Sequence, residues 1–286
     1  MPIKKYSLLS IALFALILVL NACKKEYESI ESIDAKKIKD YLSQNNINAI
    51  KDSAGFYYQV IDTGRYGKML NRDSVFYTAT LASLNKTVYY APAAYGVEAN
   101  YLGYVSPDAF RLAMYHINRG GKIRIIVPSH LAFGKNGQSN IPSNEIIVSE
   151  ITVFPETSLT QVEDRMITSF LTTNNLSGFT RLPSGVYRNI STEGTGDVIV
   201  PTSTITAKYT GRLLNGTIFD QSGSTDLTQG INTLIEGWRK ALIGVKKGAK
   251  LRLILPSNMG YGSVASASIP ANSALDFDVE IVDVTN

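Results

Sequence analysis

An internal repeat is the feature that most constrains this 286-residue chain. Apolar residues spaced i, i+3, i+4 occur at two places 129 positions apart, and each set is followed by Asn-Asn. This spacing puts three side chains on one face of a helix, and asparagine favours a helix end. The two sets are Ile38, Tyr41 and Leu42 before Asn45-Asn46, and Ile167, Phe170 and Leu171 before Asn174-Asn175. We therefore expect two similar helices, one ahead of each half of the chain.

Further motif pairs follow each predicted helix in the same order. The pairs are Gly55-Phe56-Tyr57 with Gly185-Val186-Tyr187, Tyr77-Thr78 with Tyr209-Thr210, Pro128-Ser129 with Pro256-Ser257, and Ile141-Pro142 with Ile269-Pro270. A repeat of this length indicates two domains, since a compact domain usually holds about 100–200 residues. We predict a tether and helical lead-in at 23–49, a domain at 50–155, a helical linker at 156–179 and a second domain at 180–286.

Hydrophobic patterning within the repeats predicts an α+β fold. Leu251, Leu253 and Leu255 follow a two-residue period, as do the apolar residues of 275–281. This period is typical of antiparallel strands with one buried face. Residues 238–247 contain good helix formers and end before Gly248, which predicts a short helix against the sheet.

The first 23 residues have the pattern of an export signal. Lys4 and Lys5 precede the apolar run 8–20, which is too short to span a bilayer and has the length of a signal-peptide core. The only cysteine, Cys23, follows directly in a stretch that resembles a bacterial lipobox. We expect residues 1–22 to be a lipoprotein signal peptide and acylated Cys23 to anchor the chain in a bilayer. The alternative is a plain secretory signal with an incidental cysteine.

Charge and composition exclude several function classes. The chain has 28 Lys and Arg residues and 24 Asp and Glu residues, which gives a net charge of 28 − 24 = +4. Without Lys4 and Lys5 the net charge is 26 − 24 = +2. This small, interspersed excess does not predict nucleic-acid binding. Two histidines and one cysteine cannot form a His/Cys metal cluster or an internal disulfide. We expect no metal and no cofactor.

The second half contains a series of motifs that together resemble one known family. In order they are Tyr209-Thr210-Gly211, residues 215–220 (NGTIFD), residues 234–238 (LIEGW), Gly260-Tyr261-Gly262, Ser268-Ile269-Pro270 and Leu275-Asp276-Phe277. Residues 184–285 thereby resemble the FKBP-type peptidyl-prolyl cis-trans isomerases. The resemblance implies a strongly bent antiparallel sheet wrapped around a short helix, with a cleft that accepts a prolyl peptide or a macrolide. Both repeats are expected to have this fold.

The same resemblance implies a role for nine residues. Trp238 would form the floor of the pocket and Tyr209, Phe219 and Phe277 its walls. One lip would consist of Leu234 and Ile235, with the Ile235 amide available to a substrate carbonyl. Asp220 and the Tyr261 hydroxyl would supply polar contacts, and Ile269 would lie on the flap. Taken singly, the aromatic residues are also typical of an ordinary core.

The sequence departs from the family at the rim of the pocket. Residues 224–227 lack the aromatic pair usual there and contain Thr225 and Leu227 instead. Rotation about an X–Pro bond must overcome about 18–20 kcal/mol of lost amide resonance. A dry aromatic cavity favours the less charge-separated twisted amide, and no nucleophile, base or metal is required. The shortage of histidine and cysteine therefore fits this activity.

The first repeat changes the residues of the pocket. Trp238, Tyr261 and Phe277 are matched by Phe110, Phe133 and Ser149. Around residues 88–90, after a small insertion, no aspartate matches Asp220, although Tyr77 and Ile141 remain. These changes predict a non-catalytic binding or dimerising module at 50–155. Five tyrosines crowd it and form either a polypeptide-binding face or ordinary sheet packing: Tyr89, Tyr90, Tyr95, Tyr101 and Tyr104.

Together these patterns favour one function and leave a rival open. The favoured hypothesis is an isomerase of the cell envelope, lipid-anchored to the outer membrane on its periplasmic or surface face, that acts on prolyl-containing polypeptides. The rival is a non-catalytic scaffold of an outer-membrane, secretion or motility assembly, because a fold does not fix a function.

Overall fold

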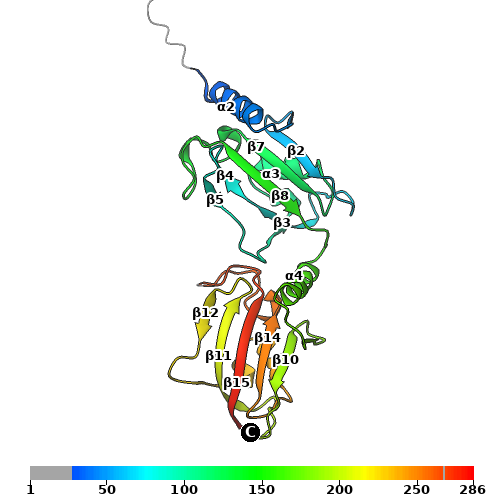
Figure 1. Cartoon of the computed structure of the whole chain (residues 1–286), viewed down its shortest axis with the longest axis vertical. Helices are drawn as coiled ribbons and strands as arrows, with labels where there is room; N and C mark the ends of the chain where they lie inside the picture. The colour runs from blue at the N-terminus through cyan, green and yellow to red at the C-terminus, as the bar shows by residue number, and fades with distance from the viewer. Residues whose placement is uncertain (1–27, 267) are drawn as a thin grey trace, which may run out of the picture.

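The computed structural model describes residues 28–266 and 268–286, and they contain two separate antiparallel sheets (Figure 1). The signal-peptide prediction and Cys23 lie outside the described residues. Four α-helices accompany the sheets: α2 (Ile30–Gln44), α3 (Asp108–Met114), α4 (Leu159–Thr173) and α5 (Glu236–Leu242). The prediction of an α+β fold with antiparallel sheets is confirmed.

The first sheet has eight strands in the order β1-β2-β7-β8-β3-β6, and β4 pairs with both β5 and β8. The strands are β1 (Ile50–Lys51), β2 (Tyr57–Asp62), β3 (Ser74–Ala79), β4 (Leu81–Ala82), β5 (Val88–Tyr90), β6 (Glu98–Tyr101), β7 (Lys122–Val127) and β8 (Ile147–Val153). Alternate residues of β8 are buried, as expected for a strand with one core face. The short helix α3 buries Phe110 and Met114 in the core of this domain.

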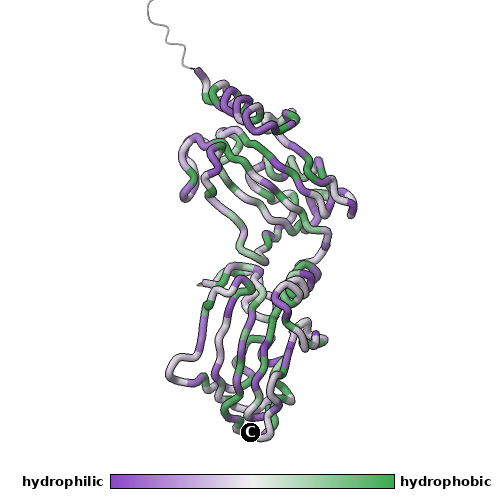
Figure 2. Tube along the Cα trace, viewed as in Figure 1, coloured by the Kyte–Doolittle hydropathy of each residue, from purple (hydrophilic) through white to green (hydrophobic). Residues whose placement is uncertain are grey.

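The second sheet has seven strands in the order β12-β11-β15-β14-β10-β9, with β13 paired to β11. They are β9 (Thr180–Arg181), β10 (Tyr187–Thr192), β11 (Thr204–Leu213), β12 (Ile218–Gln221), β13 (Leu227–Gly230), β14 (Lys250–Leu255) and β15 (Leu275–Thr285). Hydropathy alternates along these strands in Figure 2: one face of the sheet packs on α5, and the other carries polar residues together with a smaller apolar cluster that packs on α4.

The helix predicted at 238–247 is shorter than expected and ends at Leu242. Residues 244–247 turn instead into a backbone pairing with 197–199: the Gly244 amide donates to the Ile199 carbonyl, and the Ile199 amide to the Val245 carbonyl. Gly244 has φ +85°, which ends the helix. A long-range backbone pairing, which the local sequence does not reveal, therefore overrides the helix propensity of these residues.

Strand pairing shows how the two halves correspond. Lys122 pairs with Thr152 in the first sheet and Lys250 with Glu280 in the second, an offset of 128 residues for both strands. Tyr77 pairs with Val153, whereas the equivalent Ile281 pairs with Ala207. The match of Tyr77-Thr78 to Tyr209-Thr210 is therefore wrong by two residues, and Ala79 takes the place of Tyr209. A chance Tyr-Thr pair misled the sequence comparison, because register is set between strands and not by local identity.

Both predicted lead-in helices are present, and each docks on the sheet that follows it. α2 buries Ile38 against Ile126 and Ile146, and α4 buries Ile167 with Ile254. Each helix is capped by asparagine, at Asn45 and Asn174. The second asparagine of each pair, Asn46 or Asn175, has a positive φ, which asparagine tolerates better than most residues.

A buried carboxylate fixes each lead-in helix to the repeated Pro-Ser motif. Asp34 Oδ2 accepts hydrogen bonds from the Ser129 amide at 2.8 Å and its hydroxyl at 2.7 Å. One repeat later, Glu163 Oε1 accepts from the Ser257 amide at 3.0 Å, and burial raises the pKa of Glu163. Since a buried amide without an acceptor costs about 1–3 kcal/mol, these contacts explain why Pro-Ser recurs with the helices.

The remaining face of α4 packs on the first domain. Val162 and Met166 form a buried cluster with Phe76 of β3, and Phe154 packs against it. Tyr95, in the segment between β5 and β6, meets Phe170 edge to face at a centroid distance of 5.6 Å. α4 therefore contacts both domains, through adjacent faces of the helix.

Candidate active site of the second domain

A cavity of about 270 Å³ opens between the inner face of the second sheet and α5. Seven of the nine residues singled out from the sequence line it: Tyr209, Asp220, Leu234, Ile235, Trp238, Tyr261 and Phe277. They come from β11, β12, the start of α5, the loop after β14, and β15. The fold thus gathers into one cavity residues that are up to 68 positions apart, counted from 209 to 277.

The aromatic side chains form a connected set of edge-to-face contacts. Trp238 meets Tyr209 at a centroid distance of 5.6 Å and Phe277 at 5.4 Å, with interplanar angles of 90° and 88°. Phe219 meets Phe277 at 5.6 Å and 87°. Such geometry fixes the rings and is worth about 0.5–1.5 kcal/mol per pair beyond burial. The cavity therefore has a rigid, apolar wall.

Gly211 makes room for this wall. A Cβ at this position would lie 2.7 Å from Phe277 Cε1 and 2.8 Å from Phe219 Cζ. The Phe277 ring has no open side to move into, because it is buried against Trp238. The glycine is thus required by close approach and not by its backbone angles.

Two tyrosine hydroxyls and one carboxylate supply polar groups at the cavity. The Tyr209 hydroxyl donates to Asp220 Oδ2 at 2.7 Å. Burial, helped by this hydrogen bond, raises the pKa of Tyr209. Burial followed by the charge of Asp220 raises the pKa of Tyr261. Both hydroxyls therefore keep their protons at neutral pH and remain hydrogen-bond donors.

The Ile235 amide is a further donor at the cavity. Ile235 is the N-cap of α5, and its carbonyl accepts from the amides of Trp238 and Arg239. Among residues 28–266 and 268–286, no acceptor lies within hydrogen-bond reach of its own amide. The indole Nε1 of Trp238 is likewise buried without a partner in the described part of the chain. A carbonyl group entering the cavity would find the Ile235 amide without a competing acceptor.

The other two of the nine residues lie behind the wall. Phe219 supports Phe277 from outside the cavity. Ile269 is buried in the same core cluster and forms a two-way backbone bridge with Ser266 in the flap. Of the two substitutes at the rim, Leu227 lines the cavity and Thr225 does not.

Sequence reasoning missed two polar residues that line the cavity, Gln229 and Thr233. Gln229 lies on β13 opposite Ile205, and Thr233 ends a short 3-10 turn that leads into α5. No local pattern marks them, since their position depends on how β13 pairs with β11.

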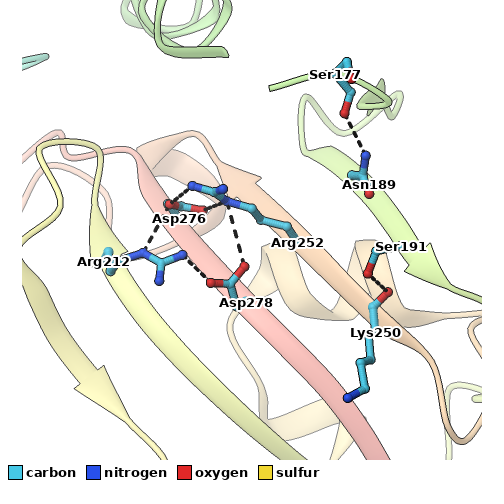
Figure 3. A network of polar contacts seen from close by, with 8 residues as sticks. All are labelled: Ser177, Asn189, Ser191, Arg212, Lys250, Arg252, Asp276 and Asp278. Carbon is cyan, nitrogen blue, oxygen red and sulfur yellow. Dashed lines mark hydrogen bonds and ion pairs between the residues drawn. The ribbon is translucent and has the colours of Figure 1, made fainter. Parts of the chain in front are cut away.

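An ion-pair network on the outer face fixes the strand that carries Phe277. Figure 3 shows Asp276 of β15 between two arginines. Its carboxylate accepts from Arg252 Nε at 2.8 Å and Nη2 at 2.7 Å, and from Arg212 Nε at 3.4 Å. Arg212 also pairs with Asp278 at 2.5 Å. Since successive strand residues point to opposite faces, holding Asp276 and Asp278 outward holds Phe277 inward.

Strand register identifies what the first domain has at each position of the cavity. Leu81 pairs with Tyr90 as Gly211 pairs with Asp220, so Tyr90 replaces the carboxylate, and Tyr89 replaces Phe219. The prediction of a small insertion before residue 90 is therefore wrong. The extra residues come afterwards, because Tyr90 to Phe110 spans 20 positions and Asp220 to Trp238 spans 18.

The first domain also lacks the free amide. Its short helix α3 has Pro107 as N-cap, where α5 has Ile235, and proline carries no N–H. Ser149 pairs with Ile125 as Phe277 pairs with Leu253, which places Ser149 in the position of the aromatic wall. The first domain has therefore lost the carboxylate, the amide donor and the central aromatic ring.

Comparison with known proteins finds a family model that matches most of the second domain. The model of the FKBP-type peptidyl-prolyl cis-trans isomerases matches residues 196–282. FkpA of Buchnera aphidicola subsp. Schizaphis graminum is 40% identical over 116 residues, which are 40% of this chain and 46% of that protein. A probable FKBP-type isomerase of Haemophilus influenzae is 42% identical over 104 residues, 35% of this chain and 43% of that protein.

Among solved structures, FkpA from Escherichia coli is similar at 28% identity with a TM-score of 0.40, covering 44% of this chain and 59% of that one. The chain matches less than half the length of the two curated relatives. The family match covers all seven predicted residues that line the cavity. The second domain therefore contains a region, residues 196–282, that matches the model of the FKBP-type peptidyl-prolyl cis-trans isomerases.

Proposed function

We propose that the chain is a peptidyl-prolyl cis-trans isomerase that assists the folding of prolyl-containing polypeptides, with its activity in the second domain. The observation that carries this proposal is the aromatic cavity of 270 Å³ with free donors at its edge. A prolyl ring fits an apolar wall made of Trp238 and Phe277. The Ile235 amide would hold the carbonyl group of a neighbouring peptide unit.

The cavity would lower the barrier by binding the twisted amide better than the planar one. Rotation requires loss of about 18–20 kcal/mol of resonance, and the planar amide has the larger charge separation. Apolar walls stabilise the planar form poorly, whereas donors that hold a neighbouring carbonyl fix the segment without restoring resonance. Positioning and exclusion of water are then sufficient, and no residue forms a covalent bond.

A prolyl tetrapeptide assay on the whole chain tests the proposal. We expect acceleration of cis-trans exchange over the uncatalysed rate. Tyr261→Phe should lower kcat/KM about threefold to tenfold, because one hydrogen bond is worth about 0.5–1.5 kcal/mol net. Tyr104→Phe, at a tyrosine that is 77% exposed in the first domain, is the matched control and should change nothing. A wild-type rate equal to the uncatalysed one would leave the non-catalytic scaffold.

We propose that the first domain does not catalyse, and that residues 50–155 bind a second copy of the chain or an assembly component. The replacements Tyr90, Pro107 and Ser149 support the first statement. The exposed tyrosines Tyr101 and Tyr104, 53% and 77% exposed, support the second. Isomerase activity that persists after the second-domain site is inactivated would contradict the first, and a monomeric mass in sedimentation would exclude self-association.

We also propose that acylated Cys23 anchors the chain to the outer membrane, on its periplasmic or surface face. The support is the sequence of residues 4–23. No helix among the described residues has the length and apolar character needed to cross a membrane. In a bacterial host, Cys23→Ser should move the chain from the membrane to the soluble fraction and abolish labelling by radioactive palmitate. A variant that stays in the membrane fraction would contradict the anchor.

A further inference from the structure

A second cavity lies between the two domains and is larger than the isomerase cavity, at about 590 Å³. One wall is the segment 90–99 of the first domain. The other consists of residues 213–215 at the end of β11 and of parts of 263–274, the flap that follows β14. In Figure 1 the segment between β5 and β6 extends toward these loops of the second domain. Neither domain forms this cavity alone.

Both walls are held in place by buried contacts. On the first-domain side, Tyr95 packs edge to face on Phe170 of α4, and Val97 packs with the cluster of Phe76 and Met166. On the second-domain side, Leu214 and Ala274 belong to the same buried cluster as Phe170. α4 is therefore common to both walls, and the cavity does not depend on a chance approach of two loose loops.

Only a few residues of the flap lie between the linings of the two cavities. Tyr261 lines the isomerase cavity and Ser263 lines the interdomain cavity. Two consecutive Cα–Cα steps put these residues at most about 7.6 Å apart. Ile269, buried in the core beside the isomerase cavity, is followed at once by Pro270, which lines the interdomain cavity. An extended polypeptide advances about 3.3–3.6 Å per residue, so a few residues beyond a bound proline reach across the flap.

The lining indicates what chemistry the interdomain cavity accepts. It contains seven alanines and one glycine, with Tyr90, Tyr95, two leucines and four uncharged polar residues, Asn215, Ser263, Asn272 and Ser273. Among the described lining residues Glu98 has the only charge, and its Oε1 accepts from the Tyr90 hydroxyl at 2.7 Å. Small side chains leave the backbone accessible, and an engaged carboxylate leaves little to attract a cation. Such a surface suits an uncharged, extended chain with apolar side chains.

We propose that the interdomain cavity binds the polypeptide segment that flanks the proline held in the isomerase cavity. The inference rests on the proposed function, since it places the two cavities along one client chain. A tetrapeptide extends at most two residues from its proline, about 7 Å, and cannot fill the second cavity. A longer apolar client occupies both, and the first domain then contributes to substrate binding without a catalytic group of its own.

The test compares two substrates and two matched arginine variants of the full chain. Ala94 is exposed and lines the interdomain cavity, so Ala94→Arg adds bulk and charge there without disturbing a core. Ala54, exposed in a turn of the first domain away from the cavity, gives the control Ala54→Arg. The substrates are a prolyl tetrapeptide and a 20-residue peptide with one proline between Leu, Val and Ala. Anisotropy of the labelled long peptide measures binding independently of catalysis.

We expect Ala94→Arg to raise both Kd and KM for the long peptide about fivefold to tenfold and to leave tetrapeptide kcat/KM unchanged within about twofold. Ala54→Arg should change neither.

Unaltered binding of the long peptide by Ala94→Arg, or an equal loss with both substrates, would overturn the proposal. So would self-association of the chain that Ala94→Arg abolishes while peptide binding persists, because the occupant would then be a second copy. A wild-type chain that binds the long peptide but accelerates neither substrate refutes the proposed function alone. Ala93→Arg, at another exposed lining residue, repeats the test if Ala94→Arg melts early.

Discussion

An Ile235→Pro chain is expected to keep its fold and to lose about fivefold to hundredfold of kcat/KM toward a prolyl tetrapeptide. The substitution deletes the backbone N–H of a cavity-lining residue, and this N–H has no acceptor in the described chain. A substrate carbonyl desolvated in the cavity would then lack its donor, which costs about 1–3 kcal/mol. A tenfold change in rate corresponds to about 1.4 kcal/mol.

The backbone at this position already suits proline. Ile235 has φ −56° and ψ 150°, within the range to which the proline ring restricts φ. Leu234, with φ −76° and ψ 160°, has the extended conformation required of a residue before proline. We therefore expect the melting temperature to stay within about 3 °C of wild type.

Ile235→Ala is the matched control for this experiment. It removes most of the side chain but keeps the amide, so its kcat/KM should stay within about threefold of wild type. If the proline variant melts normally and retains full activity, the amide does not bind substrate. If alanine is as damaging as proline, the side chain and not the amide accounts for the loss.

The contrast between Ile235 and Pro107 also shows where the sequence was sufficient and where it was not. Residues 234–238 and the aromatic residues around them indicated the cavity because their types and order are distinctive. The match of Trp238 to Phe110 already places Pro107 at the position of Ile235, but the sequence does not show that both residues cap a helix. The replacement of Asp220 by Tyr90 could not be identified from the sequence, because it is fixed by strand pairing.

The lead-in helices give a second example. Their apolar spacing predicted two helices, and both are present. Their buried carboxylates were not identified, because Asp34 acts on Ser129 and Glu163 on Ser257, across 95 and 94 residues of sequence. A repeated Pro-Ser dipeptide was visible as a pattern, but its cause was a contact with a helix far away in the chain.

We expect Gly211→Leu and Phe277→Ser each to destabilise the second domain strongly. The double variant should lose less free energy of unfolding than the sum of the two single losses. In the first domain these positions hold Leu81 and Ser149, as the strand pairing shows. Leu81 packs against the core there, and Ser149 is buried. A large residue on one strand thus accompanies a small one on the other, and the second domain has the reverse arrangement.

The magnitudes follow from packing. Leucine at 211 would drive a side chain into Phe277 and Phe219, and overpacking a core costs about 1–3 kcal/mol. Phe277→Ser empties a buried site, and loss of a buried phenylalanine ring costs about 3–5 kcal/mol. In the double variant the leucine occupies part of the space that the ring vacates. We expect a coupling of about 1–2 kcal/mol in free energies of unfolding measured with urea.

Restored stability should not bring back catalysis. The double variant has a filled wall but no ring at 277, so the edge-to-face contact with Trp238 is lost and the cavity changes shape. We expect its isomerase rate to stay near the uncatalysed one while its unfolding free energy exceeds that of Phe277→Ser. Strictly additive losses of unfolding free energy would show that the lack of a side chain at Gly211 is not needed to accommodate Phe277. Recovery of activity with stability would mean that the aromatic wall serves packing alone, and that the first domain lost its site through the amide and the carboxylate.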